Sequence, residues 1–389
     1  MEQAYGSKRV CYDNRMIDAR TELTKIIKKA LVTSECGLVS FSIEHPAHPQ
    51  FGDLSTNAAM VVAKNMSSNS RELATKIVQS ILDQKSEILE KVEVAGPGFI
   101  NFTLSKKYHA STINAIHKEG ETFGSSTRGN NRFAIVEFSS PNIAKPFTIG
   151  HLRSTIIGDA IARLLSFSGY HVLRDNHLGD WGTQFGKQIV ALKKWGSEEE
   201  LAKAAQPVQY LVELYVKFHT EAEQDATLED EARAWFVKLE QHDEEAQRIW
   251  KLCVDYSMVQ FHVLYQMLDV KFDMMLGESF FEDKMQPVLD DLVAKKLATE
   301  SEGALLVFFQ DDKYPPLMVR KKDGATLYAT RDLATDRYRI NTWGKDILII
   351  NEVGAEQSMY FKQVYETEEL LGYLKKEQRV HVGHGLMRF

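Results

Sequence analysis

The residues best suited to chemistry lie in one short segment, which reads Glu137-Phe-Ser-Ser-Pro-Asn-Ile-Ala-Lys-Pro-Phe-Thr-Ile-Gly-His151. Residues 132–138 predict a strand, and apolar side chains recur at helical spacing from about Gly150 onward. A turn from strand to helix directs free backbone N–H groups and the positive end of the helix dipole toward one point, which suits a phosphate. Gly150 leaves room for a close ligand, and Lys145 and His151 add donors and positive charge. The segment therefore predicts a nucleotide phosphate site at the mouth of a parallel α/β sheet.

The elements that must position this segment alternate between strands and helices. Further strands are predicted at residues 171–174, 304–309, 317–320, 346–350 and 380–382. Helices are predicted at residues 181–195, 329–342 and 355–372, the first beginning at Trp181 with Asp180 as its N-cap. This alternation predicts a doubly wound parallel sheet. The strongly helical residues 200–275 predict an insertion outside that sheet.

The N-terminal part of the chain has a different pattern. Helices are predicted at residues 14–32, 55–64 and 70–83, followed by a hairpin over 92–104 that turns at Gly96-Pro97-Gly98. We expect a small α+β domain over residues 1–112, a turn-rich linker over 113–131, and a catalytic domain over 132–389 with a helical insertion at about 197–300.

Composition places the chain among ordinary globular proteins. Apolar residues make up 44% and charged residues 26%, and no apolar run is long enough for a transmembrane helix. The net charge of −7 argues against a general nucleic-acid binder. The acidic stretch from Glu198 to Glu245 is interpreted as a solvated helical face. Cys11, Cys36 and Cys253 are scattered and form no Cys-x-x-Cys pair, so the sequence favours a reducing cytosol over a disulfide framework or a zinc site.

A second motif makes the first more specific. On its own, Gly-His at a helix start is a weak signal, because a capped helix followed by a surface histidine explains it equally well. Together with Asp175-Asn-His-Leu-Gly-Asp-Trp-Gly-Thr-Gln-Phe-Gly186, however, the segment resembles the active site of the arginyl-tRNA synthetases, a class I family. The tetrapeptide Thr148-Ile-Gly-His151 is similar to that family's HIGH signature, and the resemblance extends from about Ile43 to Phe389.

The resemblance implies a fold and an activity. The fold would be a class I Rossmann-like parallel sheet with a helical insertion, preceded by an α+β domain that contacts the tRNA elbow. The activity would be that of an arginine–tRNA ligase, which activates L-arginine with ATP and transfers it to tRNA(Arg). ATP would be a substrate accompanied by Mg²⁺, and we expect no protein-bound metal. We also expect a cytoplasmic monomer without membrane contact.

The resemblance also implies roles for individual residues. The catalytic residues would be His151, Lys145, Thr148 and Gly150, and ATP would contact Pro141, Thr148, Gly150 and His151. The arginine site would comprise Glu137, Ser139, Asn142, Tyr328, Asp332 and Gln357. Planar recognition of a guanidinium by a carboxylate makes Asp332 the key member. The alternative for Asp332 is a surface carboxylate paired with Arg331 or Arg337 along one helix.

Two further groups follow from the resemblance. An active-site loop would contain His177, Asp180, Trp181 and Gln184. Phe99 and Asn101 would contact tRNA, and the alternative for Phe99 is that it belongs only to the core of the small domain. Arg153 and Asp159 are assigned to helix packing and surface pairing instead.

The chain stops just before the point where the family has its KMSKS-type loop and anticodon-binding domain. Its last residues are His381-Val-Gly-His-Gly-Leu-Met-Arg-Phe389. We therefore expect a fragment of an arginine–tRNA ligase in which the anticodon-binding domain is absent. Two alternatives stay open. One is a truncated, non-catalytic relative that binds tRNA or nucleotide, and the other is a different HxGH nucleotidylyltransferase that needs no tRNA.

Overall fold

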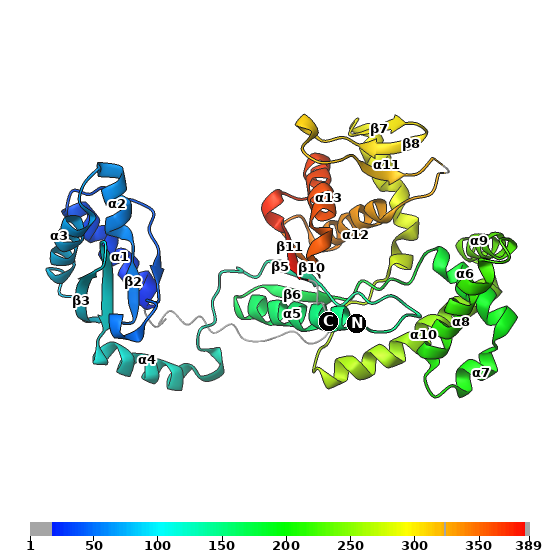
Figure 1. The fold of residues 1–389 in the computed structure, drawn as a ribbon, viewed down its shortest axis with the longest axis horizontal. Coiled ribbons are helices and arrows are strands. Elements are labelled where there is room, and N and C mark those ends of the chain that lie inside the picture. Colours follow the sequence, from blue (N-terminus) through cyan, green and yellow to red (C-terminus); the bar gives the residue numbers. More distant parts are fainter. Residues whose placement is uncertain (1–17, 323, 386–389) are drawn as a thin grey trace. The chain divides into compact units, whose positions relative to one another are not determined.

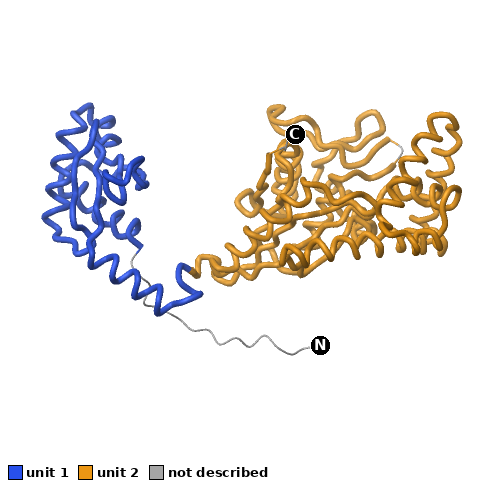
Figure 2. The backbone as a smooth tube through the Cα atoms, turned by 60° about the horizontal axis from the view of Figure 1, so that its bottom comes forward, with its two compact units in different colours: residues 1–124 blue, residues 125–389 orange. Residues whose placement is uncertain are grey.

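The computed structural model of the chain describes residues 18–322 and 324–385. Cys11, the predicted helical residues 14–17, position 323 of a predicted turn and the last four residues lie outside this part. Two compact units divide the chain, Met1–Gly124 and Ser125–Phe389 (Figure 2). The helix α4 (Lys106–Glu119) continues through residue 112, where the sequence predicts the first domain to end. The domain limits given above stay predictions.

The N-terminal unit is a four-stranded antiparallel sheet covered by helices (Figure 1). The strand order is β1-β2-β4-β3, and the elements are α1 (Ala19–Thr33), β1 (Ile43–Glu44), β2 (Leu54–Thr56), α2 (Ala58–Met66), α3 (Ser70–Leu82), β3 (Leu89–Ala95) and β4 (Phe99–Leu104). Asp18 caps α1 by accepting from the backbone N–H groups of Arg20 and Thr21, and α1 buries Leu23 and Ile27 in the core.

The second unit is built on a four-stranded parallel sheet with the order β11-β10-β5-β6. Its strands are β5 (Phe133–Glu137), β6 (His171–Asp175), β10 (Leu348–Gly354) and β11 (Arg379–His384). Glu137 lies opposite Asn351 on one side and Asp175 on the other, so the carboxyl ends of β5, β10 and β6 meet at one edge. The predicted parallel α/β fold is confirmed.

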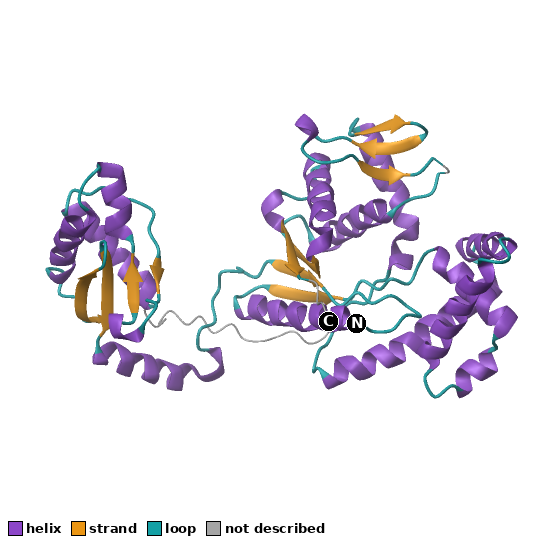
Figure 3. Cartoon of the chain, viewed as in Figure 1, coloured by secondary structure: helices purple, strands orange, loops and turns teal. Residues whose placement is uncertain are grey.

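Helices cover both faces of this sheet (Figures 1 and 3). On one face, α5 (Ile149–Phe167) packs Ala162 against Val136 and Ile350. On the other, α12 (Tyr328–Trp343) and α13 (Ser358–Leu371) pack against Ile135 and Ile349. Alternate residues of β5 and β10 thus enter different cores, as buried parallel strands require.

One glycine allows α5 to approach the sheet closely. A Cβ atom on Gly158 would lie 2.1 Å from Cγ of Phe138, a fully buried residue that follows β5. Real Cβ atoms do not come this close, so a larger residue at 158 would push α5 off the strand β5, which leads into the loop before that helix.

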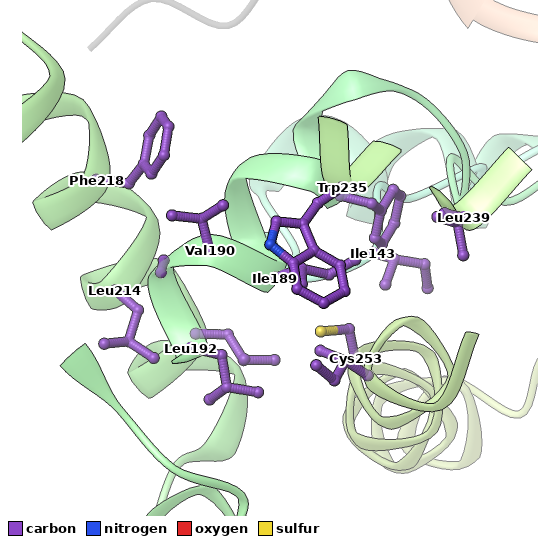
Figure 4. Close-up of a cluster of buried hydrophobic side chains, with 14 of the residues drawn as sticks. Ile143, Ile189, Val190, Leu192, Leu214, Phe218, Trp235, Leu239 and Cys253 are labelled. Atoms are coloured by element: carbon purple, nitrogen blue, oxygen red, sulfur yellow. The ribbon is translucent and has the colours of Figure 1, made fainter. Parts of the chain in front are cut away.

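Five helices form a separate layer, namely α6 (Thr183–Trp195), α7 (Glu198–Lys203), α8 (Pro207–Ala222), α9 (Thr227–Glu240) and α10 (Glu244–Met267). Their core includes Ile189, Val190, Leu214, Trp235 and Cys253 (Figure 4). The predicted N-cap of α6 is wrong. The helix begins at Thr183 with Gly182 as its N-cap, because Asp180 accepts hydrogen bonds from the backbone and hydroxyl of Ser279, 99 residues away.

The remaining strands form their own sheet. β7 (Ala298–Ser301), β8 (Ala304–Val307) and β9 (Leu317–Arg320) pair antiparallel and follow the helix α11 (Met285–Ala294). The two strands predicted near 304 and 317 therefore exist but do not join the parallel sheet. Within the described ranges, no helix is long and apolar enough to cross a membrane.

Candidate active site

A pocket of about 390 Å³ lies at the carboxyl ends of the parallel strands. Ten of the residues predicted for the site line it, and these are Glu137, Ser139, Asn142, Thr148, Gly150, His151, His177, Tyr328, Asp332 and Gln357. They come from the ends of β5, β6 and β10 and from the beginnings of α5 and α12. Chain segments far apart in the sequence thus meet where the strand order reverses, which is the usual ligand position in open α/β sheets.

One corner of the pocket is formed by the first turn of α5, where the sequence predicts a phosphate site. The backbone N–H of Thr148 donates to His151 Nδ1 at 3.0 Å, and burial lowers the pKa of the imidazole. In the neutral ring Nδ1 is therefore the acceptor and Nε2 carries the proton. The Nε2–H group and the free N–H groups of the first helical turn can both donate to an anion.

The loop between β5 and α5 contains three non-glycine residues in the left-handed region. Ser139, Ser140 and Ala144 have φ angles of 71°, 43° and 56°. Hydrogen bonds hold this conformation, since the backbone N–H of Ser139 donates to Ser154 Oγ at 2.9 Å and the Ser139 hydroxyl contacts the Tyr265 hydroxyl at 2.8 Å. Backbone strain of this kind persists only where the surroundings enforce it, and it is common in ligand-binding segments.

Glu137 forms one wall of the pocket and is held by a cation. Arg339 donates to its Oε2 at 2.5 Å, and Asn351 donates to its Oε1 at 2.9 Å. Burial acts to raise the pKa of Glu137, but the charge and hydrogen bonds of Arg339, with His177 and Asn351, lower it to about 2. Glu137 is therefore ionised and its orientation is fixed.

The guanidinium of Arg339 belongs to a larger buried network. It also reaches Asp175 at 2.6 Å and Asp336 at 2.9 Å, and its side chain is only 3% exposed. Arg379 continues the network, pairing with Asp336 at 2.6 Å. These contacts join β5, β6, α12 and β11 directly beneath the pocket.

Asp332 is held in a different way. Its Oδ2 accepts a hydrogen bond from the hydroxyl of Tyr360, and no ion pair involves Asp332 in the part of the chain that the structure describes. Burial raises the pKa of Asp332 to about 6, although Tyr360 and His177 act to lower it. The alternative that Asp332 pairs with Arg331 or Arg337 is wrong, because Arg331 lies near Glu278 and Glu282, and Arg337 contacts Asp291.

The lining is strongly acidic. Its carboxylates are Glu137, Glu278, Asp332, Glu352 and Glu356, and no Lys or Arg is among the described lining residues. Burial raises the pKa of Glu278 to about 7, against the opposing charge of Arg331. A pocket with this charge balance favours a ligand that carries its own positive group. Within the described ranges, no group of three or more His, Cys, Asp or Glu residues is arranged to hold a metal ion.

Several predicted residues lie outside this pocket. Pro141 is buried beside it, and Lys145 is exposed and lines a small neighbouring cavity with Gln184. Trp181 packs against Phe236 and Trp250, on the side of the helical layer. Of the four residues predicted for the active-site loop, only His177 lines the pocket, and the carboxylate of Asp180 is bonded to Ser279 instead.

The residues predicted to contact tRNA lie in the N-terminal unit. Phe99 is 38% exposed, whereas Asn101 is buried and accepts a hydrogen bond from Ser55 at 2.7 Å. Arg153 contacts the backbone oxygen of Gly385, and Asp159 pairs with Arg163 and Arg174.

Sequence reasoning missed Tyr360, Glu278, Glu352, His384 and Arg339. Tyr360 stands three residues after Gln357, so the helical spacing could have placed it near the pocket. Glu352 and His384 pair at 2.8 Å at the ends of adjacent strands, a position that the parallel-sheet rule could have indicated. Glu278 and Arg339 carry no local signal, because only the tertiary fold brings them here.

This geometry defines a class of protein. A parallel sheet, a strained loop that leads into a helix N-terminus and a polar pocket at the switch point are together typical of nucleotide-binding α/β domains. Residues 112–388 match the family described as tRNA synthetases class I (R), catalytic domain, and residues 20–104 match the arginyl tRNA synthetase N terminal domain. The chain therefore belongs to the arginyl-tRNA synthetase family, and the resemblance seen in the sequence is confirmed.

Individual relatives agree with this assignment. The chain is 41% identical to an arginine–tRNA ligase of Clostridioides difficile over 373 residues, covering 96% of this chain and 65% of the relative. It is 44% identical to one of Clostridium perfringens, covering 89% of this chain and 60% of the relative. The crystal structure of arginyl-tRNA synthetase from Plasmodium falciparum superposes with a TM-score of 0.77 at 26% identity, over 96% of this chain and 66% of that one. The chain thus spans less than two thirds of these curated relatives.

Proposed function

We propose that this chain carries the arginine-activating site of an arginine–tRNA ligase. The observation that carries the proposal is Asp332, a half-buried carboxylate that lines the pocket without an ion-pair partner among the described residues. A partly desolvated carboxylate of this kind is stabilised when a cationic ligand supplies the missing charge. The guanidinium of L-arginine matches it in charge and in planar hydrogen-bonding geometry.

The two ends of the pocket suit the two substrates. Asp332, Tyr328 and Gln357 would receive the arginine side chain, with Glu137, Ser139 and Asn142 near its α-amino end. Thr148, Gly150 and His151 would receive the phosphates of ATP, with Lys145 and Pro141 close to them. Mg²⁺ would accompany the nucleotide and supply positive charge that the lining lacks.

The proposed reaction depends on how the protein positions the two substrates more than on covalent catalysis by a side chain. A carboxylate oxygen of arginine attacks the α-phosphorus of ATP, the bond to the leaving pyrophosphate breaks, and arginyl-adenylate forms. A hydroxyl at the 3′ end of tRNA(Arg) then attacks the arginyl carbonyl and releases AMP. The imidazole of His151 and the helix N-terminus would stabilise the phosphate charge that develops in the first step.

A second candidate is a relative that binds nucleotide or tRNA without turnover. The absence of Lys and Arg from the described lining favours it, since the departing pyrophosphate then has few positive partners.

We also propose that the N-terminal unit contacts tRNA through its exposed Phe99, and that the protein acts as a cytoplasmic monomer. The buried free thiols of Cys36 and Cys253 fit a reducing compartment.

ATP–pyrophosphate exchange with L-arginine, in the presence and absence of tRNA(Arg), tests the proposal. Exchange that depends on both arginine and tRNA is expected for a ligase of this family. ATP binding without any exchange in the presence of tRNA(Arg) would favour the binding relative. Exchange that proceeds with another acid and ignores arginine would contradict both.

A further inference from the structure

Two carboxylates of the same pocket are stabilised in opposite ways. Glu137 is neutralised by a cation, the guanidinium of Arg339, at 2.5 Å. Asp332 is held by a neutral donor, the hydroxyl of Tyr360. A cation already bound to a carboxylate competes with a cationic ligand, whereas a neutral donor leaves the negative charge available. Of the two carboxylates, Asp332 is therefore the one whose charge is free to pair with the guanidinium of a ligand.

The position of Tyr360 follows from the fold. β10 ends at Gly354, the short 3-10 helix η5 (Ala355–Gln357) turns the chain, and α13 begins at Ser358. Tyr360 lies in the first turn of α13, its ring packs against Phe361, and both Tyr360 and Asp332 line the pocket. Asp332 lies in the second turn of α12, so the hydrogen bond ties together two helices that frame the site.

The surroundings of Asp332 disfavour its charge. Burial, Glu137 and Asp336 all act to raise its pKa, and Glu278 is close enough that its own pKa responds to Asp332. His177 and the hydroxyl of Tyr360 act in the other direction. Without the phenol, the carboxylate would lose the hydrogen bond that stabilises its ionised form and fixes its orientation.

We propose that Tyr360 is a positioning residue for Asp332, whose hydroxyl keeps the carboxylate ionised and oriented and so sets the pH range in which the pocket binds arginine. The inference rests on the proposed function, because it assumes that the guanidinium meets Asp332. It adds a residue and a pH dependence that the proposed function does not require.

The test is Tyr360→Phe in the 389-residue chain, with L-arginine binding measured by isothermal titration calorimetry at pH 6 and pH 8.5. A rise of about one unit in the pKa of Asp332, from about 6, lowers its ionised fraction at pH 6 from about a half to about a tenth. We therefore expect arginine to bind about fivefold more weakly at pH 6 and within about twofold of the unmodified chain at pH 8.5. Titration of Glu278 and the other lining groups is common to both proteins and cancels in the ratio.

Tyr373→Phe is the matched control, because it removes a buried phenol that donates to another carboxylate, Asp291, at 2.6 Å outside the pocket lining. It should leave arginine affinity unchanged at both pH values. With Asp332→Asn in the background, Tyr360→Phe should cause no further loss, since there is no carboxylate left to ionise. A loss independent of pH, an equal loss in the control, or a full further loss in the double variant would overturn the inference.

Two further outcomes keep the test decisive. If the unmodified chain does not bind arginine at either pH, the proposed function itself fails. If Tyr360→Phe does not fold, 3-fluorotyrosine at position 360 keeps the shape and makes the phenol a stronger donor. The midpoint of the pH dependence of arginine binding should then move downward, and an unchanged or raised midpoint would overturn the inference.

Discussion

Replacing Arg339 by methionine should expose how much of the stability of the second unit rests on the buried charge network. Arg339 donates to Glu137, Asp175 and Asp336 at 2.5, 2.6 and 2.9 Å. Methionine has a similar length but no charge, so the buried carboxylates of Asp175 and Asp336 and the partly buried one of Glu137 would lose their shared cation. Breaking a buried ion pair from one side costs about 3–5 kcal/mol, and we expect the unfolding free energy to fall by that amount at pH 7.

The pH dependence has a definite sign. The pKa of Glu137 is lowered from 4.5 to about 2, so its contribution, of order 3 kcal/mol by linkage, is present above pH 4.5 and lost as the pH falls toward 2. Without Arg339, burial would dominate and raise the pKa of Glu137 above that of the unfolded chain, and the pKa of Asp175, which burial already raises in the presence of Arg339, would rise further. Protonation of these carboxylates then removes their unpaired charge. The difference in unfolding free energy between the unmodified chain and the variant should therefore shrink between pH 7 and pH 5.

Tryptophan fluorescence during urea unfolding measures this effect selectively, because all five tryptophans of the chain belong to the second unit. Arg233→Met is the control, since Arg233 forms a surface pair with Asp230 and should cost less than about 1 kcal/mol. If Arg339→Met lowers the unfolding free energy by less than about 1 kcal/mol at pH 7, or if the loss of unfolding free energy grows on acidification, the reasoning is refuted.

Three further predictions concern the pocket and its support. Asp332→Ala should weaken L-arginine binding by about 3–5 kcal/mol, and a dissociation constant within about twofold of the unmodified chain would rule out its role. His151→Ala should slow pyrophosphate exchange by about 100-fold or more while calorimetry shows unchanged arginine affinity; a loss confined to arginine affinity would place His151 at the other end of the pocket. Gly158→Ala would set a Cβ 2.1 Å from the ring of Phe138, so urea unfolding should show destabilisation by about 1–3 kcal/mol, and a neutral effect would mean that α5 does not press on the strand.

Much of the site could be predicted because its residues sit in short motifs next to strand ends. Thr148, Gly150 and His151 stand at the end of the loop that follows β5 and at the start of the next helix, and His177 comes directly after β6. The periodicity that predicts those strands also predicts where they end, and parallel strands bring their carboxyl ends together. The motif and the fold rule thus point to the same edge of the sheet.

What could not be predicted depends on contacts distant in sequence. The local pattern made Asp180 an N-cap, but its carboxylate is occupied by Ser279, so a tertiary hydrogen bond overrides the local preference. Residues 304–307 and 317–320 form strands as expected, yet the sequence pattern does not say which sheet they join. The Asp332–Tyr360 hydrogen bond joins two helices and likewise has no local signature.

The most direct test of the account compares L-arginine with L-citrulline, its neutral isostere, by calorimetry on the 389-residue chain at pH 7.5. If Asp332 receives the guanidinium, arginine should bind at one site per chain, citrulline at least about 100-fold more weakly, and Asp332→Asn should remove the difference. Equal affinity for the two ligands, or a preference for arginine that survives Asp332→Asn, would contradict the account.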